Sequence, residues 1–195
     1  MAKIYTLLNN NLDNIQKIIK NQENIAYGFH LDIIESKNNY DKSIWPDLIT
    51  QIKNITQKPL QVHLLVQQPE EYINELNLNS IDTVIIDLAS KSKLSLNQLI
   101  NLIISKNKKV GIAINQDTPL ESIIHIVMPI NSVLINSSEN NNEKNINLLI
   151  HKINALNNYK IAHKIPLDII VKGNLIKDNI EKLIKVGTNE IIFVK

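Results

Sequence analysis

The chain contains no cysteine and no arginine, and it has only four glycines among its 195 residues. The lack of cysteine excludes thiolate metal sites, disulfide bonds and cysteine nucleophiles, and it favours a reducing compartment. The lack of arginine excludes a forked, bidentate grip on a carboxylate or phosphate, so an anion must be held by lysine or by backbone amides. Because glycines are so few, amide-lined phosphate cradles are also scarce.

The charge balance and the hydropathy pattern exclude two further classes of partner. The chain has 21 basic and 19 acidic residues and a formal net charge of +2, so it lacks the broad positive surface that binds nucleic acid or an anionic membrane. No apolar run approaches the roughly 20 residues that span a bilayer. The segment from Met1 to Leu12 lacks the basic start and apolar core of a signal peptide. We therefore expect a cytoplasmic protein that binds neither nucleic acid nor membrane.

Short apolar runs alternate with longer stretches of helical spacing along the whole chain. Eight runs rich in Ile and Val are predicted strands: Ile4–Leu8, Tyr27–Ile34, Leu60–Val66, Thr83–Leu88, Val110–Ile114, Ser132–Ile135, Leu167–Val171 and Glu190–Val194. The stretches between them predict seven helices: Leu12–Ile19, Trp45–Ile55, Pro69–Leu76, Leu96–Ile104, Pro119–Val127 with Thr118 as its N-cap, Ile146–Leu156 and Leu175–Val186. Strands of this composition are buried on both faces, as a parallel sheet requires.

Eight is the number of parallel strands that closes a TIM barrel, so we predict a single α/β domain over residues 1–195, a small (β/α)₈ barrel. An open doubly wound sheet is the alternative. The sequence ends just after the eighth predicted strand, so we expect the last helix to be missing. A barrel without that helix would leave an Ile-rich wall between its eighth and first strands, and we expect a homo-oligomer in which a second subunit covers this wall.

Two histidines and one aspartate interrupt the apolar strands. His30 and Asp32 lie two residues apart on the second predicted strand, so both side chains point to the same face, and His63 stands on the third strand. In a barrel this face is the interior near the C-terminal mouth. Buried polar side chains need a partner. One interpretation is a His–Asp hydrogen bond within the core, and the other is a divalent-metal site beside a carboxylate base.

Three stretches of the sequence resemble successive motifs of the ribulose-phosphate 3-epimerase family, in the same order and spacing. They are His30-Leu31-Asp32-Ile33, Val62-His63-Leu64-Leu65-Val66 with Pro69-Glu70 following, and the run from Lys109 to Glu121. The resemblance extends over essentially the whole chain. It implies a (β/α)₈ barrel that interconverts ribulose 5-phosphate and xylulose 5-phosphate through an enediolate, a step of the pentose phosphate pathway.

The resemblance also implies the residues of the site. In the family, a divalent metal (zinc, manganese or iron) is held by two histidines and two aspartates, and the aspartates are the acid/base groups on opposite faces of the substrate. By matching positions, His30, Asp32 and His63 are three of the metal ligands, and Asp32 is one catalytic acid/base. Three further positions correspond to substrate-binding residues: Thr6, Gly173 and Asn174.

Lys172 is the main departure from the family pattern. The family carries its second aspartate in a Val-Asp-Gly-Gly-Ile stretch, which here reads Val171-Lys172-Gly173-Asn174-Leu175. The change removes an anionic ligand and adds a positive charge, so a site without metal, in which Lys172 is a second catalytic residue, is the alternative to a metal site. The glycine-rich phosphate loop of the family is replaced by Ser137-Ser138-Glu139-Asn140-Asn141.

These residues predict a divergent pentulose-phosphate 3-epimerase, an isomerase whose substrate is a phosphorylated sugar. The alternative is a catalytically inactive barrel of the same family that acts as a binding or interaction module. A third hypothesis uses Lys172 in another enolising reaction or as a Schiff-base nucleophile. The sequence by itself leaves the three hypotheses open.

Overall fold

The computed structural model describes residues 2–8, 12–35, 44–76, 78–138 and 142–194. Its eight strands are parallel and follow one another around a closed barrel: β1 (Lys3–Leu8), β2 (Gly28–Ile34), β3 (Leu60–Leu65), β4 (Thr83–Asp87), β5 (Lys109–Asn115), β6 (Ser132–Asn136), β7 (Asp168–Gly173) and β8 (Glu190–Phe193). The barrel closes where β1 pairs with β8, with Lys3 opposite Glu190 and Thr6 opposite Phe193. This closure confirms the predicted barrel and excludes an open sheet.

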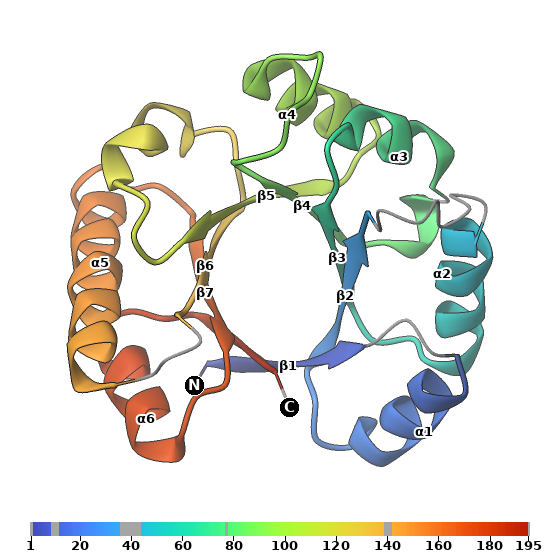
Figure 1. The fold of residues 1–195 in the computed structure, drawn as a ribbon, viewed down its shortest axis with the longest axis horizontal. Coiled ribbons are helices and arrows are strands. Elements are labelled where there is room, and N and C mark those ends of the chain that lie inside the picture. The colour runs from blue at the N-terminus through green and yellow to red at the C-terminus, as the bar shows by residue number, and fades with distance from the viewer. Residues whose placement is uncertain (1, 9–11, 36–43, 77, 139–141, 195) are drawn as a thin grey trace.

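Helices surround the barrel as an outer ring (Figure 1). They are α1 (Leu12–Gln22), α2 (Ile44–Ile55), α3 (Pro69–Glu75), α4 (Leu96–Ser105), α5 (Glu143–Ala162) and α6 (Lys177–Lys185), with the short 3₁₀ helix η1 (Leu78–Ser80) after α3. Every predicted strand is present, with ends that agree to within two residues. No helix follows β8 within the described residues, which end at Val194. Within the same residues, no helix is both long enough and apolar enough to cross a bilayer.

The predicted helix at Pro119–Val127 is wrong. The structure has two 3₁₀ helices there, η2 (Leu120–Ser122) and η3 (Ile124–Ile126), and Thr118 does not cap either of them. Their backbone hydrogen bonds span three residues, as in the 3.0 Å bond from the amide of Ile123 to the carbonyl of Leu120. Four β-branched residues in this short segment disfavour a continuous α-helix, and 3₁₀ turns commonly form in such short connections.

The barrel has two apolar cores. The larger lies between the strands and the helices, and the smaller fills the barrel interior with side chains from six strands: Tyr5, Ile85, Ala113, Leu134, Ile170 and Ile192. Strand alternation separates the two sets, because successive side chains point to opposite faces. The interior is therefore packed rather than hollow, and polar side chains inside it occupy defined positions.

The outer wall at β1 and β8 is less well covered than the rest. Ile4 and Phe193, which pack against the outer core, are only half-buried. On the neighbouring strands the outward side chains, such as Leu31 and Ile169, are fully buried. Apolar side chains of this wall therefore remain in partial contact with solvent.

Candidate functional site

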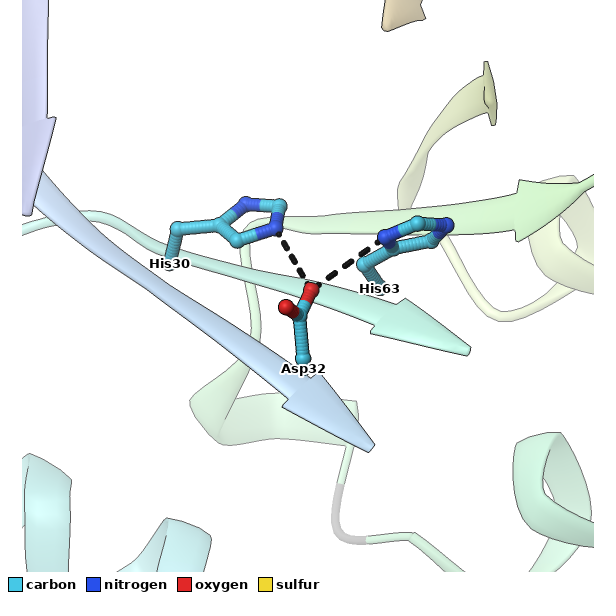
Figure 2. A group of neighbouring side chains, drawn as sticks. All are labelled: His30, Asp32 and His63. Carbon is cyan, nitrogen blue, oxygen red and sulfur yellow. Dashed lines mark hydrogen bonds and ion pairs between the residues drawn. The ribbon is translucent and has the colours of Figure 1, made fainter. Parts of the chain in front are cut away.

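The side chains of His30, Asp32 and His63 converge inside the barrel from β2 and β3 (Figure 2). His30 and Asp32 share a face of β2 because they lie two residues apart, and the parallel register sets Asp32 opposite His63. Both histidines are fully buried, whereas the Asp32 side chain is 14% exposed. The carboxylate is therefore the member of this group that is accessible from the mouth of the barrel.

One oxygen of the Asp32 carboxylate contacts both imidazole rings. The Oδ1 atom lies 3.2 Å from Nε2 of His30 and 3.2 Å from Nδ1 of His63. The other ring nitrogen of His63, Nε2, is 3.8 Å from Oδ2 of Asp87, and it has no hydrogen-bond partner among the described residues. The two rings thus hold the carboxylate from one side and leave its second oxygen free to meet another group.

That group is Lys172, which reaches the carboxylate from β7. Its Nζ lies 2.5 Å from Oδ1 of Asp32 and also contacts Oδ2. The lysine is 9% exposed, so the ion pair is largely shielded from water. The structure brings together the four residues that the sequence suggested for the centre of the site, although Asp32 and Lys172 are 140 positions apart in the chain.

The surroundings of Asp32 keep its carboxyl group ionised. Burial by itself raises the pKa of Asp32, but hydrogen bonds from His30 and His63 and the positive charge of Lys172 outweigh burial and hold that pKa well below its usual range. Burial lowers the pKa of His30, because an imidazolium would lose its hydration there. Asp32 is therefore held as an anion, and its partner across the barrel is Lys172.

Gln61 and Glu190 form a second layer below His30, which the sequence analysis missed. The side-chain amide nitrogen of Gln61 donates a 2.6 Å hydrogen bond to Glu190, and its amide oxygen lies 3.3 Å from Nδ1 of His30. Both side chains are buried, at 2% and 4% exposure, and Lys3 contacts the far oxygen of Glu190 at 3.3 Å. The sequence did carry a signal for this layer, because Gln61 and Glu190 are polar residues in otherwise apolar strands. Gln61 also lies two residues before His63, and so on the same face of β3.

The three positions predicted to bind substrate are not all near this centre. Thr6 lies on β1 between Tyr5 and Leu7, which belong to the interior core, so alternation directs Thr6 toward the outer face. Gly173 and the exposed Asn174 directly follow Lys172 at the end of β7, on the mouth side. The structure therefore supports Gly173 and Asn174 as neighbours of the site and separates Thr6 from it.

The loop after β6 is close-packed against β7. A Cβ atom on Gly173 would lie 1.8 Å from the hydroxyl oxygen and 3.0 Å from the Cβ of Ser137, so any larger residue would require Ser137 to move. That hydroxyl is buried and has no hydrogen-bond partner among the described residues, and the amide of Ser138 donates to Gln116. The rest of the predicted loop, residues 139–141, lies outside the described residues.

Two cavities open at the carboxyl ends of the strands. One, of about 480 Å³, is lined by the ends of β2, β3 and β4 and includes Asp87. The other, of about 650 Å³, lies over the ends of β5 and β6 and includes Asn136 and Ser137. Ligands of (β/α)₈ barrels bind at this end. The mouth around Asp32 is thus flanked by space for a small polar molecule.

Comparison with known proteins identifies the family. A profile of the "Ribulose-phosphate 3 epimerase family" matches residues 4–195. The chain belongs to this family. Epimerase relatives include the chloroplastic ribulose-5-phosphate-3-epimerase of Arabidopsis thaliana, 26% identical over 165 residues that make up 84% of this chain and 59% of the relative. The ribulose-phosphate 3-epimerase of Bacillus subtilis is 25% identical over 166 residues, 84% of this chain and 76% of the relative.

Solved structures give the same fold. A mutant tryptophan synthase α-subunit of Pyrococcus furiosus has a TM-score of 0.77 at 12% identity, covering 98% of this chain and 86% of that one. At this level of identity the likeness concerns the barrel alone. Function must therefore be argued from the side chains at the mouth and from the epimerase family.

The donor atoms suit a divalent metal, but the charge around them does not. One atom each from His30, Asp32 and His63 lies within 4.8 Å of the others, and imidazole and carboxylate are ligands of zinc, manganese and iron. The ammonium of Lys172, however, already contacts both oxygens of the carboxylate. A metal ion there would meet a like charge in a poorly screened site. The residues present do not fit the metal that the family resemblance implies.

Proposed function

We propose that this chain interconverts ribulose 5-phosphate and xylulose 5-phosphate by moving a proton at C3. The observation that carries this proposal is the Asp32–Lys172 pair, a base and an acid held at the mouth of a barrel of the epimerase family. The two side chains come from β2 and β7, so a substrate that displaces the Lys172 ammonium from the Asp32 carboxylate would have an acid/base group on each face.

The proposed reaction needs only groups that the chain provides. An Asp32 oxygen takes the C3 proton, and the C–H electron pair forms the enediolate, whose negative oxygen the Lys172 ammonium stabilises by hydrogen bonding. The ammonium then returns a proton to the opposite face of C3. The carboxylic acid of Asp32 passes its proton to the lysine amine, and both groups regain their starting charges. His30 and His63 keep the carboxylate oriented throughout.

Exchange of the C3 hydrogen in D₂O tests the proposal. Purified protein is mixed with ribulose 5-phosphate, once with EDTA and once with added zinc, manganese or iron, and the C3 proton signal is followed by ¹H NMR. We expect loss of this signal, together with growth of the other proton signals of xylulose 5-phosphate, whose C3 then carries deuterium. Substrate that stays protonated under every condition, with folded protein, would contradict the proposal.

A second candidate function is a non-catalytic sugar-phosphate binding module. The ion pair favours it, because the Lys172 ammonium must leave Asp32 before the carboxylate can accept a proton. The loss of the family's loop glycines also favours it, because residues other than glycine adopt less readily the backbone conformations that turn several amides toward one phosphate. Calorimetric binding of ribulose 5-phosphate without any C3 exchange would identify this function, whereas exchange would exclude it.

We also propose that the chain forms a homo-oligomer through the wall at β1 and β8. The half-buried Ile4 and Phe193 support this proposal, because a second subunit would remove apolar surface from water. Light scattering at high micromolar concentration is expected to give a mass of at least two chains, and Phe193→Glu is expected to reduce it. A single-chain mass for the unchanged protein would overturn the proposal.

A further inference from the structure

We infer that the Lys172 ammonium is a built-in substitute for the divalent metal, so that this barrel binds no zinc, manganese or iron at its centre. The position of the ammonium supports this inference first. It contacts both oxygens of the Asp32 carboxylate, one of which also lies 3.2 Å from a nitrogen of each imidazole ring, so the carboxylate that would ligate a metal is already paired with a cation. The inference concerns which cation occupies the site, and it holds for a catalytic or a non-catalytic barrel.

The charge balance of the site supports the same inference. Relative to the family pattern, one aspartate has become a lysine, which changes the local charge from −1 to +1, a difference of +2. A divalent ion also contributes +2. With Asp32 as the remaining carboxylate, the pair with Lys172 is neutral, as two carboxylates with a divalent ion would be. A second cation would leave the buried centre with uncompensated positive charge.

The chemistry available to the site differs as a result. A metal offers open coordination positions to substrate oxygens, whereas an ammonium offers three N–H donors and a single charge. Lys172 can therefore donate hydrogen bonds to an oxyanion, and it can also give up a proton. This barrel combines in one side chain the charge and the proton that a metal and a second aspartate would supply separately.

Metal binding by the purified protein and three variants tests the inference. Lys172→Asp restores a fourth ligand and removes the repulsion, Lys172→Met removes only the repulsion, and Lys177→Asp makes the same charge change on the exposed surface of α6. Each protein is analysed for bound metal by mass spectrometry. Each is then titrated with Zn²⁺ by calorimetry and with Co²⁺ by visible absorption, which reports the coordination geometry.

We expect no stoichiometric metal in the unchanged protein or in Lys177→Asp. Lys172→Asp should bind one Zn²⁺ at least about 100-fold more tightly than the unchanged protein, because loss of an outer-shell partner alone costs 10- to 100-fold. The Zn²⁺ affinity of Lys172→Met should lie between that of the unchanged protein and that of Lys172→Asp. Adding His63→Ala to Lys172→Asp should abolish the tight binding and the Co²⁺ absorption bands.

Two outcomes would overturn the inference. One is a tightly bound divalent metal in the unchanged protein that survives dialysis against EDTA. The other is equal Zn²⁺ affinity for all four proteins when circular dichroism shows that they are folded. If Lys172→Asp does not fold, Lys172→Met still tests the inference, because the inference requires its Zn²⁺ affinity to exceed that of the unchanged protein. Neither outcome depends on turnover, so failure of this inference is separate from failure of the proposed epimerase activity.

Discussion

Replacing Asp32 by asparagine is expected to slow C3 proton exchange on ribulose 5-phosphate by about 10²- to 10⁴-fold, the usual contribution of a positioned general base. The amide oxygen of asparagine accepts hydrogen bonds as the carboxylate does, but it does not accept a proton at neutral pH. The measurement is the first-order loss of the C3 proton signal in D₂O at saturating substrate. Binding of ribulose 5-phosphate, followed by calorimetry, should change much less than the rate.

The stability of this variant needs its own control, because asparagine leaves the buried Lys172 ammonium without an anion. Breaking a buried ion pair by removing one partner costs about 3–5 kcal/mol. The double variant Asp32→Asn/Lys172→Met removes both charges and should fold where the single variant does not. Asp178→Asn, on the exposed surface of α6, should exchange at the rate of the unchanged protein. Undiminished exchange in the folded double variant would show that another group removes the proton.

Leu134→Ala is expected to destabilise the protein by about 2–5 kcal/mol, the range for a leucine truncated in a close-packed core. Leu134 is fully buried in the barrel interior, where its neighbours are held by eight hydrogen-bonded strands and cannot collapse into the space. Chemical denaturation followed by circular dichroism measures the loss as a lower midpoint. Urea and guanidinium should give the same ranking.

Leu148→Ala is the matched control for this substitution. Leu148 lies on α5, and it is 51% exposed. Its truncation removes the same atoms but leaves no cavity, and alanine is a better helix former, so we expect a change within about 0.5 kcal/mol. Equal losses for the two variants would show that the barrel interior is not the rigid core described above.

The strands were predictable from the sequence, and one helical segment was not. Buried parallel strands carry continuous apolar runs bounded by polar residues, so their ends could be located within two residues. The spacing of apolar residues at Pro119–Val127 fits a 3₁₀ turn as well as an α-helix, and periodicity does not separate the two over so few residues.

The position of Thr6 shows a second limit of the sequence. Both faces of β1 carry apolar side chains, so the sequence does not show which alternate residues point into the barrel. Only packing revealed that Tyr5 and Leu7 fill the interior and that Thr6 therefore points outward. Resemblance to a family motif assigns a position in the chain, and the direction of the side chain follows from the neighbours that it meets.

The sequence by itself determined the eight strands along the chain and the shared face of His30 and Asp32, because these follow from periodicity within a few residues. The count of eight strands made a closed barrel the leading architecture. The tertiary structure decided the contact of Lys172 with Asp32 across 140 residues and the bond of Gln61 with Glu190 across 129. Such contacts depend on how the barrel closes and on the stagger of its strands. Those quantities are set by packing of the whole ring, and no local stretch of sequence specifies them.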